Sequence, residues 1–280
     1  MASLNSASES QIEVSKAKIG YLGPGGSWTH QACLDLFGPE GLIGLESERL
    51  FAAFASGEID QACVPVTTSV VGVTPYLDPV LALSSVVVIA EYPKMLGYSL
   101  LARPGVKLED IREVVAHPVA LEEVKPWLDK EMPTVRRVTA LGGGAAAKGV
   151  SESRSLHSAS MGPKIGGSIY GLISLVDNIE EGPHNVTRWW VLGRQMPAPT
   201  GNDKTSLLVD IEDKDFSLLL EDMTAAKLKI LAIYERPSKR TLDTHLYLIE
   251  VAGHSKVGAL QQFVQANAQV RVLGSYARKY

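Results

Sequence analysis

The chain has 280 residues, of which 45% are hydrophobic and 21% charged, with a formal net charge of -4. This length favours two domains over one, the composition is ordinary for a globular protein, and no block of like charges indicates a nucleic-acid or anionic-membrane partner. The two cysteines, Cys33 and Cys63, form no CxxC pair, which argues against a disulfide framework or a zinc site.

The N-terminal segment, residues 1–17, is polar, rich in serine and mixed in charge. It lacks the apolar core of a signal peptide, so we expect a disordered tail and a cytoplasmic protein. The low cysteine content agrees with a reducing compartment. Apolar runs such as Val86 to Ala90 are too short to span a bilayer.

Strand and helix patterns alternate from residue 18 onward. The apolar run Lys18 to Leu22 ends in the turn Gly23 to Ser27, and Trp28 to Leu36 has helical spacing with Ser27 as its N-cap. Further strands are expected at Gln61 to Pro65, Val86 to Ala90, Tyr98 to Ala102, Val114 to Ala116 and Val135 to Thr139. Further helices are expected at Arg49 to Ser56, from Leu108, at Leu121 to Leu128 and at Ala145 to Val150. This alternation predicts an α/β fold of parallel sheets flanked by helices.

A segment rich in Pro, Gly and polar residues, Gln195 to Asp203, predicts a domain boundary. The pattern beyond it reads strand, helix, strand, strand, helix, strand, at Lys204 to Ile211, Phe216 to Ala226, Lys229 to Tyr234, Thr244 to Val251, Lys256 to Ala266 and Val270 to Leu273. This βαββαβ order is the ferredoxin-like α+β plan.

The turn Gly23 to Ser27 is the first candidate binding element. Glycines let backbone N–H groups approach a ligand closely, and a helix N-terminus adds positive potential, so the turn could hold an anion. The same residues also fit a tight strand-to-helix turn without a ligand, because neither a Walker lysine nor a full GxGxxG is present.

Three further segments carry polar candidates. Arg188 could bind a carboxylate bidentately, or be a surface arginine at a strand entrance, and Thr187 could donate to a leaving oxygen. Pro65 to Ser69 places three hydroxyls at a strand end, where α/β proteins bind ligands, or forms a simple Ser/Thr-rich loop. His117, also at a strand end, is the most site-like of six histidines. No two histidines have metal-ligand spacing, so we expect no metal site.

Taken together, these segments resemble the prephenate dehydratase family. Gly20 to Ala32 resembles the opening strand and Gly-rich loop of that family, Val64 to Gly72 its VPxENSxxG segment, and Ile179 to Trp189 its N-x-T-R-F segment. Residues 204–280 resemble its C-terminal ACT domain, with Tyr234 to Pro237 at the place of the family's ESRP motif. The resemblance covers nearly everything after residue 18.

The resemblance implies a fold, a reaction and an assembly. Residues 18–196 are expected to form a catalytic domain of two periplasmic-binding-protein-like lobes, and residues 203–280 an ACT-like regulatory domain. The chain is expected to cross between the lobes near Tyr92 to Gly97 and to return near Thr187. The family reaction converts prephenate, a small anionic substrate, to phenylpyruvate with loss of water and carbon dioxide, and it needs no cofactor. Because ACT domains commonly pair and the strand Thr244 to Val251 is apolar enough to be covered, we expect a homodimer or homotetramer.

The resemblance also implies roles for individual residues. Thr187 matches the threonine that hydrogen-bonds to the departing hydroxyl, and Arg188 matches an arginine that holds the substrate. The other catalytic candidates are Ser69 and His117. The expected substrate-binding residues, besides Arg188, are Ser27, Gly26, Thr67, Thr68, Asn185, Gln31 and Gly143. The expected effector-binding residues are Asp215, Phe216, Glu235 and Arg236.

Several motif positions depart from the family pattern. Thr67 and Thr68 stand where the family has Glu-Asn, Gly142 to Gly144 where it has STA, and Trp189 where it has phenylalanine. Lys214 to Phe216 replaces the GAL turn that receives an effector amino acid, so we expect no phenylalanine feedback. Two alternatives stay open: a prephenate decarboxylase that keeps the hydroxyl, and a catalytically silent binding protein.

Overall fold

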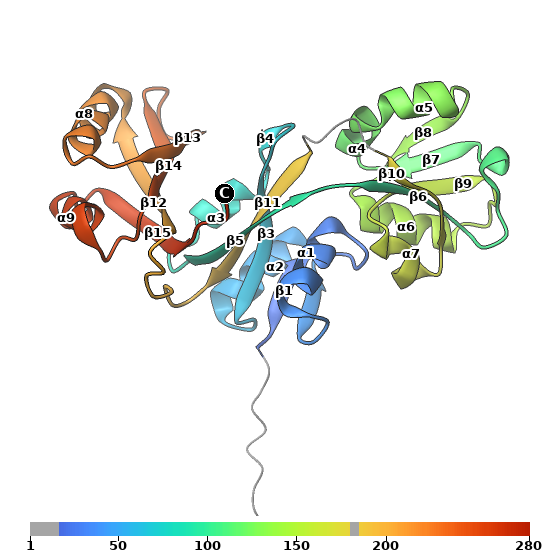
Figure 1. Cartoon of the computed structure of the whole chain (residues 1–280), viewed down its shortest axis with the longest axis horizontal. Helices are drawn as coiled ribbons and strands as arrows, with labels where there is room; N and C mark the ends of the chain where they lie inside the picture. The colour runs from blue at the N-terminus through green and yellow to red at the C-terminus, as the bar shows by residue number, and fades with distance from the viewer. Residues whose placement is uncertain (1–16, 180–184) are drawn as a thin grey trace, which may run out of the picture.

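The computed structural model describes residues 17–179 and 185–280, which form three sheets and the helices around them. Residues 1–16 of the expected tail and residues 180–184 of the Ile179 to Trp189 motif lie outside the described residues. The first sheet lies in the middle of the molecule, with the second sheet on one side and the third on the other (Figure 1). No helix in the described part is both long and apolar enough to cross a membrane.

Lobe 1 is built on a mixed sheet with the order β2-β1-β3-β11-β5, and β4 pairs with β3 in a hairpin. β1 runs parallel to β2 and β3, whereas β11 runs antiparallel to both β3 and β5. The strands are β1 (Ile19–Leu22), β2 (Leu42–Leu45), β3 (Gln61–Thr68), β4 (Gly72–Val73), β5 (Val87–Met95) and β11 (Val186–Gly193). The helices are α1 (Trp28–Phe37), α2 (Ser47–Ser56) and α3 (Leu77–Leu81).

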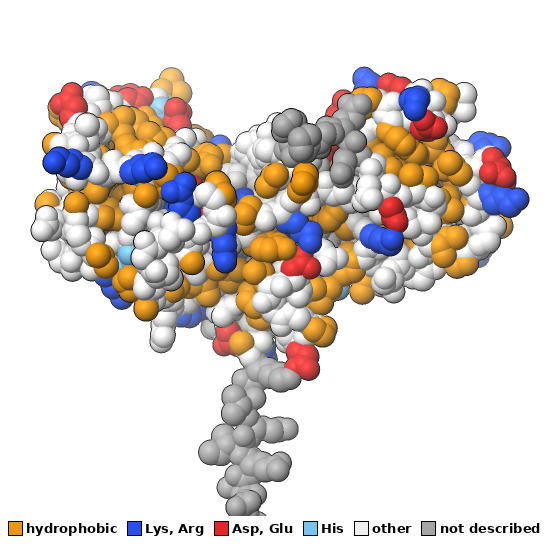
Figure 2. All heavy atoms as spheres, in the orientation of Figure 1, with side chains coloured by type: hydrophobic (Ala, Val, Ile, Leu, Met, Phe, Trp, Pro, Cys, Tyr) orange, Lys and Arg blue, Asp and Glu red, His pale blue; other side chains and the backbone are white. Residues whose placement is uncertain are grey.

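Lobe 2 is built on a second mixed sheet with the order β10-β6-β9-β7-β8. Its strands are β6 (Tyr98–Ala102), β7 (Glu113–Ala116), β8 (Arg136–Thr139), β9 (Ser158–Gly162) and β10 (Ile173–Ile179). Its helical segments are the 3-10 turn η1 (Leu108–Asp110), α4 (Pro118–Glu123), α5 (Lys125–Glu131), α6 (Gly143–Glu152) and α7 (Ile165–Tyr170). On the face drawn in Figure 2, acidic and basic side chains are interspersed over this lobe.

Two sequence expectations for these lobes need correction. The sheets are mixed rather than parallel, because β11 enters the first sheet, and β6 the second, antiparallel to their neighbours. The passage from lobe 1 to lobe 2 needs no correction: β5 of lobe 1 ends at Met95 and β6 of lobe 2 begins at Tyr98, near the expected crossing at Tyr92 to Gly97. The single helix expected at Leu121 to Leu128 is broken at Val124, because Pro126 lacks the N–H that would continue it.

The C-terminal domain has the predicted βαββαβ order. Its sheet is antiparallel, with the order β13-β14-β12-β15. The elements are β12 (Asp203–Glu212), α8 (Asp213–Ala225), β13 (Ile230–Pro237), β14 (Thr244–Ala252), α9 (Gly258–Ala266) and β15 (Val270–Ala277). In Figure 1 both helices lie on the side of this sheet that faces away from lobe 1.

The C-terminal domain shares one hydrophobic core with lobe 1. On β14, Tyr247 and Ile249 pack with the residues of α8 and α9, whereas Leu248 packs with Phe54 and Trp190 of lobe 1. The strand expected to face a second copy, Thr244 to Val251, is therefore interior and covered within the chain, because it pairs on both edges and packs on both faces. This premise for a dimer is wrong, although the dimer itself stays a prediction.

Candidate active site at the junction of the lobes

Thr187 belongs to a row of side chains across the sheet of lobe 1. Its partners in register are Thr68 on β3 and Lys94 on β5. Residues directly opposite each other in antiparallel strands point to the same face. Lys94 forms an ion pair with Asp35 of α1, so this face is the one that α1 covers. Thr187 is 5% exposed, and its hydroxyl makes no hydrogen bond to another described residue.

The glycine-rich turn leads into α1 as predicted. Ser27 is the N-cap of this helix: its hydroxyl accepts from the His30 N–H at 3.2 Å and donates to the Leu22 carbonyl at 3.3 Å. Gly26 has a φ of +75°, a conformation that favours glycine. The Tyr170 hydroxyl of lobe 2 donates to the Gly25 carbonyl at 2.8 Å, which joins this turn to the other lobe.

A second helix begins at the same point. A Cβ on Gly144 would lie 2.6 Å from the Gly25 carbonyl oxygen and 3.0 Å from the Ser27 nitrogen. The Gly142 to Gly144 run thus lets α6 of lobe 2 start directly against the start of α1. The N-termini of α1 and α6 therefore converge where the lobes meet. Each helix N-terminus carries positive potential, because its first N–H groups have no partner within the helix and the helix dipole points that way.

A hydrogen-bonded carboxyl completes this junction. The Tyr98 hydroxyl donates to Glu123 Oε2 at 2.5 Å, and the Asn185 amide donates to Glu123 and, at 3.1 Å, to the Tyr98 oxygen. Trp28, the first residue of α1, meets the Tyr98 ring edge-on at 6.1 Å between centroids. Burial raises the pKa of Glu123 above its ordinary value, against the opposing effect of the Tyr98 hydrogen bond.

Glu123, Tyr98 and Lys94 were not among the site residues expected from the sequence. The feature of the sequence that could have indicated Glu123 is His117 at the end of a strand. His117 directly precedes α4, and Glu123 is the last residue of that helix. His117 itself acts as the N-cap of α4, with its Nδ1 accepting from the Val119 N–H at 3.3 Å.

Three other predicted residues lie on this side of lobe 1, and a fourth, Gly143, lies in lobe 2. The Ser69 hydroxyl accepts from the Val186 N–H at 2.8 Å and so fixes the start of β11. The Thr68 hydroxyl accepts from the Val71 N–H at 3.0 Å, within the β3–β4 turn. Gln31 donates to Asp35 at 2.8 Å. Gly143 packs against Pro163, since a Cβ there would lie 2.7 Å from its ring.

Arg188 and Thr67 point to the opposite face of the same sheet. Arg188 is 3% exposed, and its guanidinium donates to both Glu250 oxygens at 2.6 and 2.8 Å and to Thr67 at 3.1 Å. Because successive residues of a strand alternate between faces, the neighbour of Thr187 cannot share its side. Arg188 therefore neither binds a substrate beside Thr187 nor lies on the surface, so both expectations for it are wrong.

The expected effector residues do not converge within the chain. Arg236 binds Asp78 of lobe 1 with two contacts of 2.6 and 2.8 Å. Phe216 stacks on Tyr247 at 3.6 Å between ring centroids. Glu235 Oε1 lies 3.3 Å from His245 Nε2. Asp215 lies apart from these residues, at an open pocket on the surface of the C-terminal domain. Arg236, Phe216 and Glu235 therefore each already contact another side chain.

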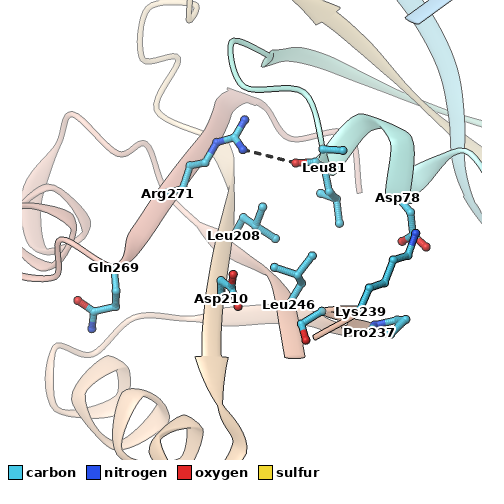
Figure 3. Close-up of a pocket in the computed structure, with 11 residues that line it drawn as sticks. Asp78, Leu81, Leu208, Asp210, Pro237, Lys239, Leu246, Gln269 and Arg271 are labelled. Carbon is cyan, nitrogen blue, oxygen red and sulfur yellow. Dashed lines mark hydrogen bonds between the residues drawn. The ribbon is translucent and has the colours of Figure 1, made fainter. Parts of the chain in front are cut away.

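Figure 3 shows a pocket of about 400 Å³ between α3 and the sheet of the C-terminal domain. Leu81, Leu208 and Leu246 line its apolar part, and Arg271 donates to the Leu81 carbonyl at 3.4 Å. None of the sequence-predicted site residues lines this pocket. The predicted residues that do meet are at the junction of the two lobes.

The sequence and the fold are both similar to those of known prephenate dehydratases. The family model described as prephenate dehydratase matches residues 19–197. The prephenate dehydratase of Mycolicibacterium gilvum is 30% identical over 92% of this chain and 90% of the relative. The crystal structure of the prephenate dehydratase of Arthrobacter aurescens in complex with L-Phe has a TM-score of 0.84 and 26% identity, covering 93% of this chain and 90% of that one. GqqA, described as a novel type of quorum quenching acylase, has a TM-score of 0.83 over 93% of this chain and 98% of its own, but at 21% identity it shows the fold alone.

Proposed function

The chain belongs to the prephenate dehydratase family, and we propose that it converts prephenate to phenylpyruvate, water and carbon dioxide at the junction of the two lobes. In this reaction the bond from the ring to its carboxylate breaks, and the electron pair enters the ring. The bond from the ring to its hydroxyl breaks as that oxygen takes up one proton. Because the ring becomes aromatic, the reaction needs no cofactor.

The two carboxylates of prephenate need positive potential, which the junction supplies. The N-termini of α1 and α6 meet at Ser27 and Gly144, each with N–H groups that the helix does not use. Lys94 adds a cation in register with Thr187, although Asp35 neutralises part of its charge. We assign the substrate carboxylates to this side of the site, with the Gly26, Ser27 and Gly143 backbone and Gln31 around them.

The observation that supports dehydration is that the Glu123 carboxyl lies next to the start of β11, the strand that contains Thr187. Hydroxide is a poor leaving group, and a carboxyl with a raised pKa is an efficient proton donor near neutral pH. Glu123 accepts a hydrogen bond from Asn185, which lies two residues before Thr187. Two residues of extended chain span roughly 7 Å. We assign the proton to Glu123 and a positioned hydrogen bond to the departing oxygen to Thr187.

This assignment also accounts for the unusual Thr67-Thr68 pair. The acid that the family resemblance places on β3 is absent there, and Glu123 supplies an acid from lobe 2 instead. Ser69, Thr68 and His117 then hold the surrounding backbone rather than the substrate. A decarboxylase that keeps the hydroxyl would also need one proton, delivered to a ring carbon in place of the departing oxygen, so the product rather than the acid distinguishes the two reactions. Identification of the product formed from prephenate tests the proposal.

For assembly and location we propose a cytoplasmic homodimer or homotetramer. The support is the edge strand β13 of the C-terminal sheet, which pairs only with β14 among the described strands. It exposes Ile233, whose side chain is 41% accessible. Such an edge offers backbone groups for pairing with a second copy.

A further inference from the structure

Four charged side chains lie buried between the sheet of lobe 1 and the sheet of the C-terminal domain. Arg188 and Glu91 come from β11 and β5 of lobe 1, and Lys204 and Glu250 from β12 and β14 of the C-terminal domain. Each is at most 3% exposed. Two positive and two negative side chains balance each other. We call these four residues the interdomain charge cluster.

Short contacts connect the cluster. Arg188 Nη1 lies 2.6 and 2.8 Å from the Glu250 oxygens and 3.5 Å from Glu91 Oε2. Lys204 Nζ lies 2.9 Å from Glu91 Oε2 and 3.6 Å from Glu250 Oε2. The Tyr280 ring covers Lys204, with its centroid 3.8 Å from Nζ. The shortest contacts of Arg188 are therefore to the C-terminal domain, not to its own lobe.

Stability alone is a poor explanation for this cluster. Taking charges out of water is costly, and apolar residues of similar volume often stabilise a protein as well or better. Leu208, Leu248 and Tyr276 of the C-terminal domain already form an apolar core with Trp190 of lobe 1. What charged groups add to such a contact is a fixed direction, because charge-assisted hydrogen bonds hold their partners in one geometry.

The cluster lies beside an irregular point in the pairing of β11, which carries Thr187, with β3. The register of β11 against β3 shifts between Arg188 and Trp189, one residue beyond Thr187, where β3 carries the extra residue Val66. Such a bulge disrupts the ladder locally and changes the direction of nearby side chains. Arg188 Nε also donates to Thr67 at 3.1 Å, and the next residue, Thr68, stands opposite Thr187. The cluster thus holds both strands from behind the Thr187–Thr68 pair.

We propose that Glu250 of the C-terminal domain is a positioning residue for the reaction in lobe 1: it fixes Arg188 at the bulge and thereby sets the direction of the Thr187 hydroxyl. This inference rests on the proposed role of Thr187 in prephenate dehydration. The C-terminal domain is then part of the catalytic unit, independently of any effector.

The test compares kcat, KM and the melting temperature of four full-length proteins with prephenate as substrate. Glu250→Met removes both acceptors and leaves one buried positive charge in excess. Lys204→Met/Glu250→Met removes the same acceptors but restores balance, since Arg188 and Glu91 remain. Asp78→Asn is the matched control, because it weakens another contact between the same two domains, to Arg236, which does not touch β11. Wild type completes the set.

Both Met variants should lose at least roughly tenfold in kcat, toward the order of 10²-fold that a misplacement of about 1 Å can cost, with KM changed much less. The double variant should recover the melting temperature but not kcat, and Asp78→Asn should keep kcat. Recovery of kcat together with stability, an unchanged kcat in Glu250→Met, or an equal loss in Asp78→Asn would each overturn the inference. If wild type does not turn over prephenate, the proposed function fails and this inference with it; turnover by wild type makes the other outcomes specific to Glu250.

Discussion

Thr187 and Arg188 are adjacent on β11 and point to opposite faces of one sheet, so that one reaches the lobe junction and the other the Glu250 carboxylate of the C-terminal domain. A two-residue motif that looks like a single substrate-binding unit is therefore divided between chemistry and positioning. Substitutions at the two positions should differ in kind, not only in size.

For Thr187→Ala we expect kcat with prephenate to fall by roughly 10²-fold or more, because one positioned donor to a departing oxygen has that effect. KM should change much less, since the carboxylates are held elsewhere. Thr187→Ser, which keeps the hydroxyl, is the matched control and should retain most of the activity. Steady-state kinetics that show a large KM change at constant kcat would make Thr187 a binding residue instead.

The acid role of Glu123 predicts a characteristic pH dependence. The proton donor must be protonated, so kcat should fall as pH rises through the raised pKa of Glu123. Glu123→Gln cannot ionise; its kcat should be lower by about 10²–10⁴-fold and should lack this alkaline decrease. Glu122→Gln, at an exposed neighbour on α4, should keep the wild-type profile. The same alkaline limb in Glu123→Gln would assign the titration to another group.

Arg188→Met should reduce stability in addition to the loss of kcat that follows from its contact with Glu250. Removal of one partner from a buried ion pair leaves an uncompensated charge and costs about 3–5 kcal/mol of unfolding free energy. Arg49→Met breaks the Arg49–Glu58 pair, whose side chains are each 50% exposed, and should change the unfolding free energy far less, because exposed ion pairs contribute little. Urea denaturation monitored by fluorescence compares the two. Equal midpoints would mean that the buried cluster contributes nothing to the folded state.

Two glycines of α6 offer a test of the lobe contact. A Cβ at Gly144 would lie 2.6 Å from a backbone oxygen of lobe 1, so Gly144→Ala should separate the two helix starts and lower kcat/KM by roughly 10–10²-fold. Gly149, in the same helix, has nothing within 4 Å of its Cβ position. Gly149→Ala should keep the activity and add about 0.5–1 kcal/mol of stability. A Gly144→Ala enzyme with wild-type kcat/KM would rule out the converging helix starts as the binding site.

Phenylalanine should neither bind tightly nor inhibit. Arg236 binds Asp78 and Phe216 stacks on Tyr247, and Lys214 and Asp215, in the first turn of α8, replace the small turn that the resemblance places there. Calorimetric titration should therefore show no micromolar binding, and the dehydration rate should not respond to phenylalanine. A micromolar Kd would mean that these side chains rearrange to admit an effector.

Local patterns predicted the parts of the fold that local physics decides. Ser27 caps α1, and the alternation of Tyr247 with Leu248 gives β14 its two packed faces, both as the sequence indicates. Short or polar strands such as β2 and β9 carry too little pattern to be found. The pairing of Glu123 with Asn185 spans 62 positions, and the meeting of Arg188 with Glu250 another 62, so no local signal could indicate either.

The central claim is that the chain removes the ring hydroxyl of prephenate, and the product decides it. Purified full-length protein should be incubated with prephenate at neutral pH and the products identified by mass spectrometry, with a buffer blank for spontaneous aromatisation. The account predicts phenylpyruvate, with one carbon dioxide and one water released per turnover, formed faster than in the blank. A non-aromatic product that keeps its hydroxyl would identify a decarboxylase, and loss of prephenate no faster than in buffer would identify a silent binding protein; either result would contradict the account.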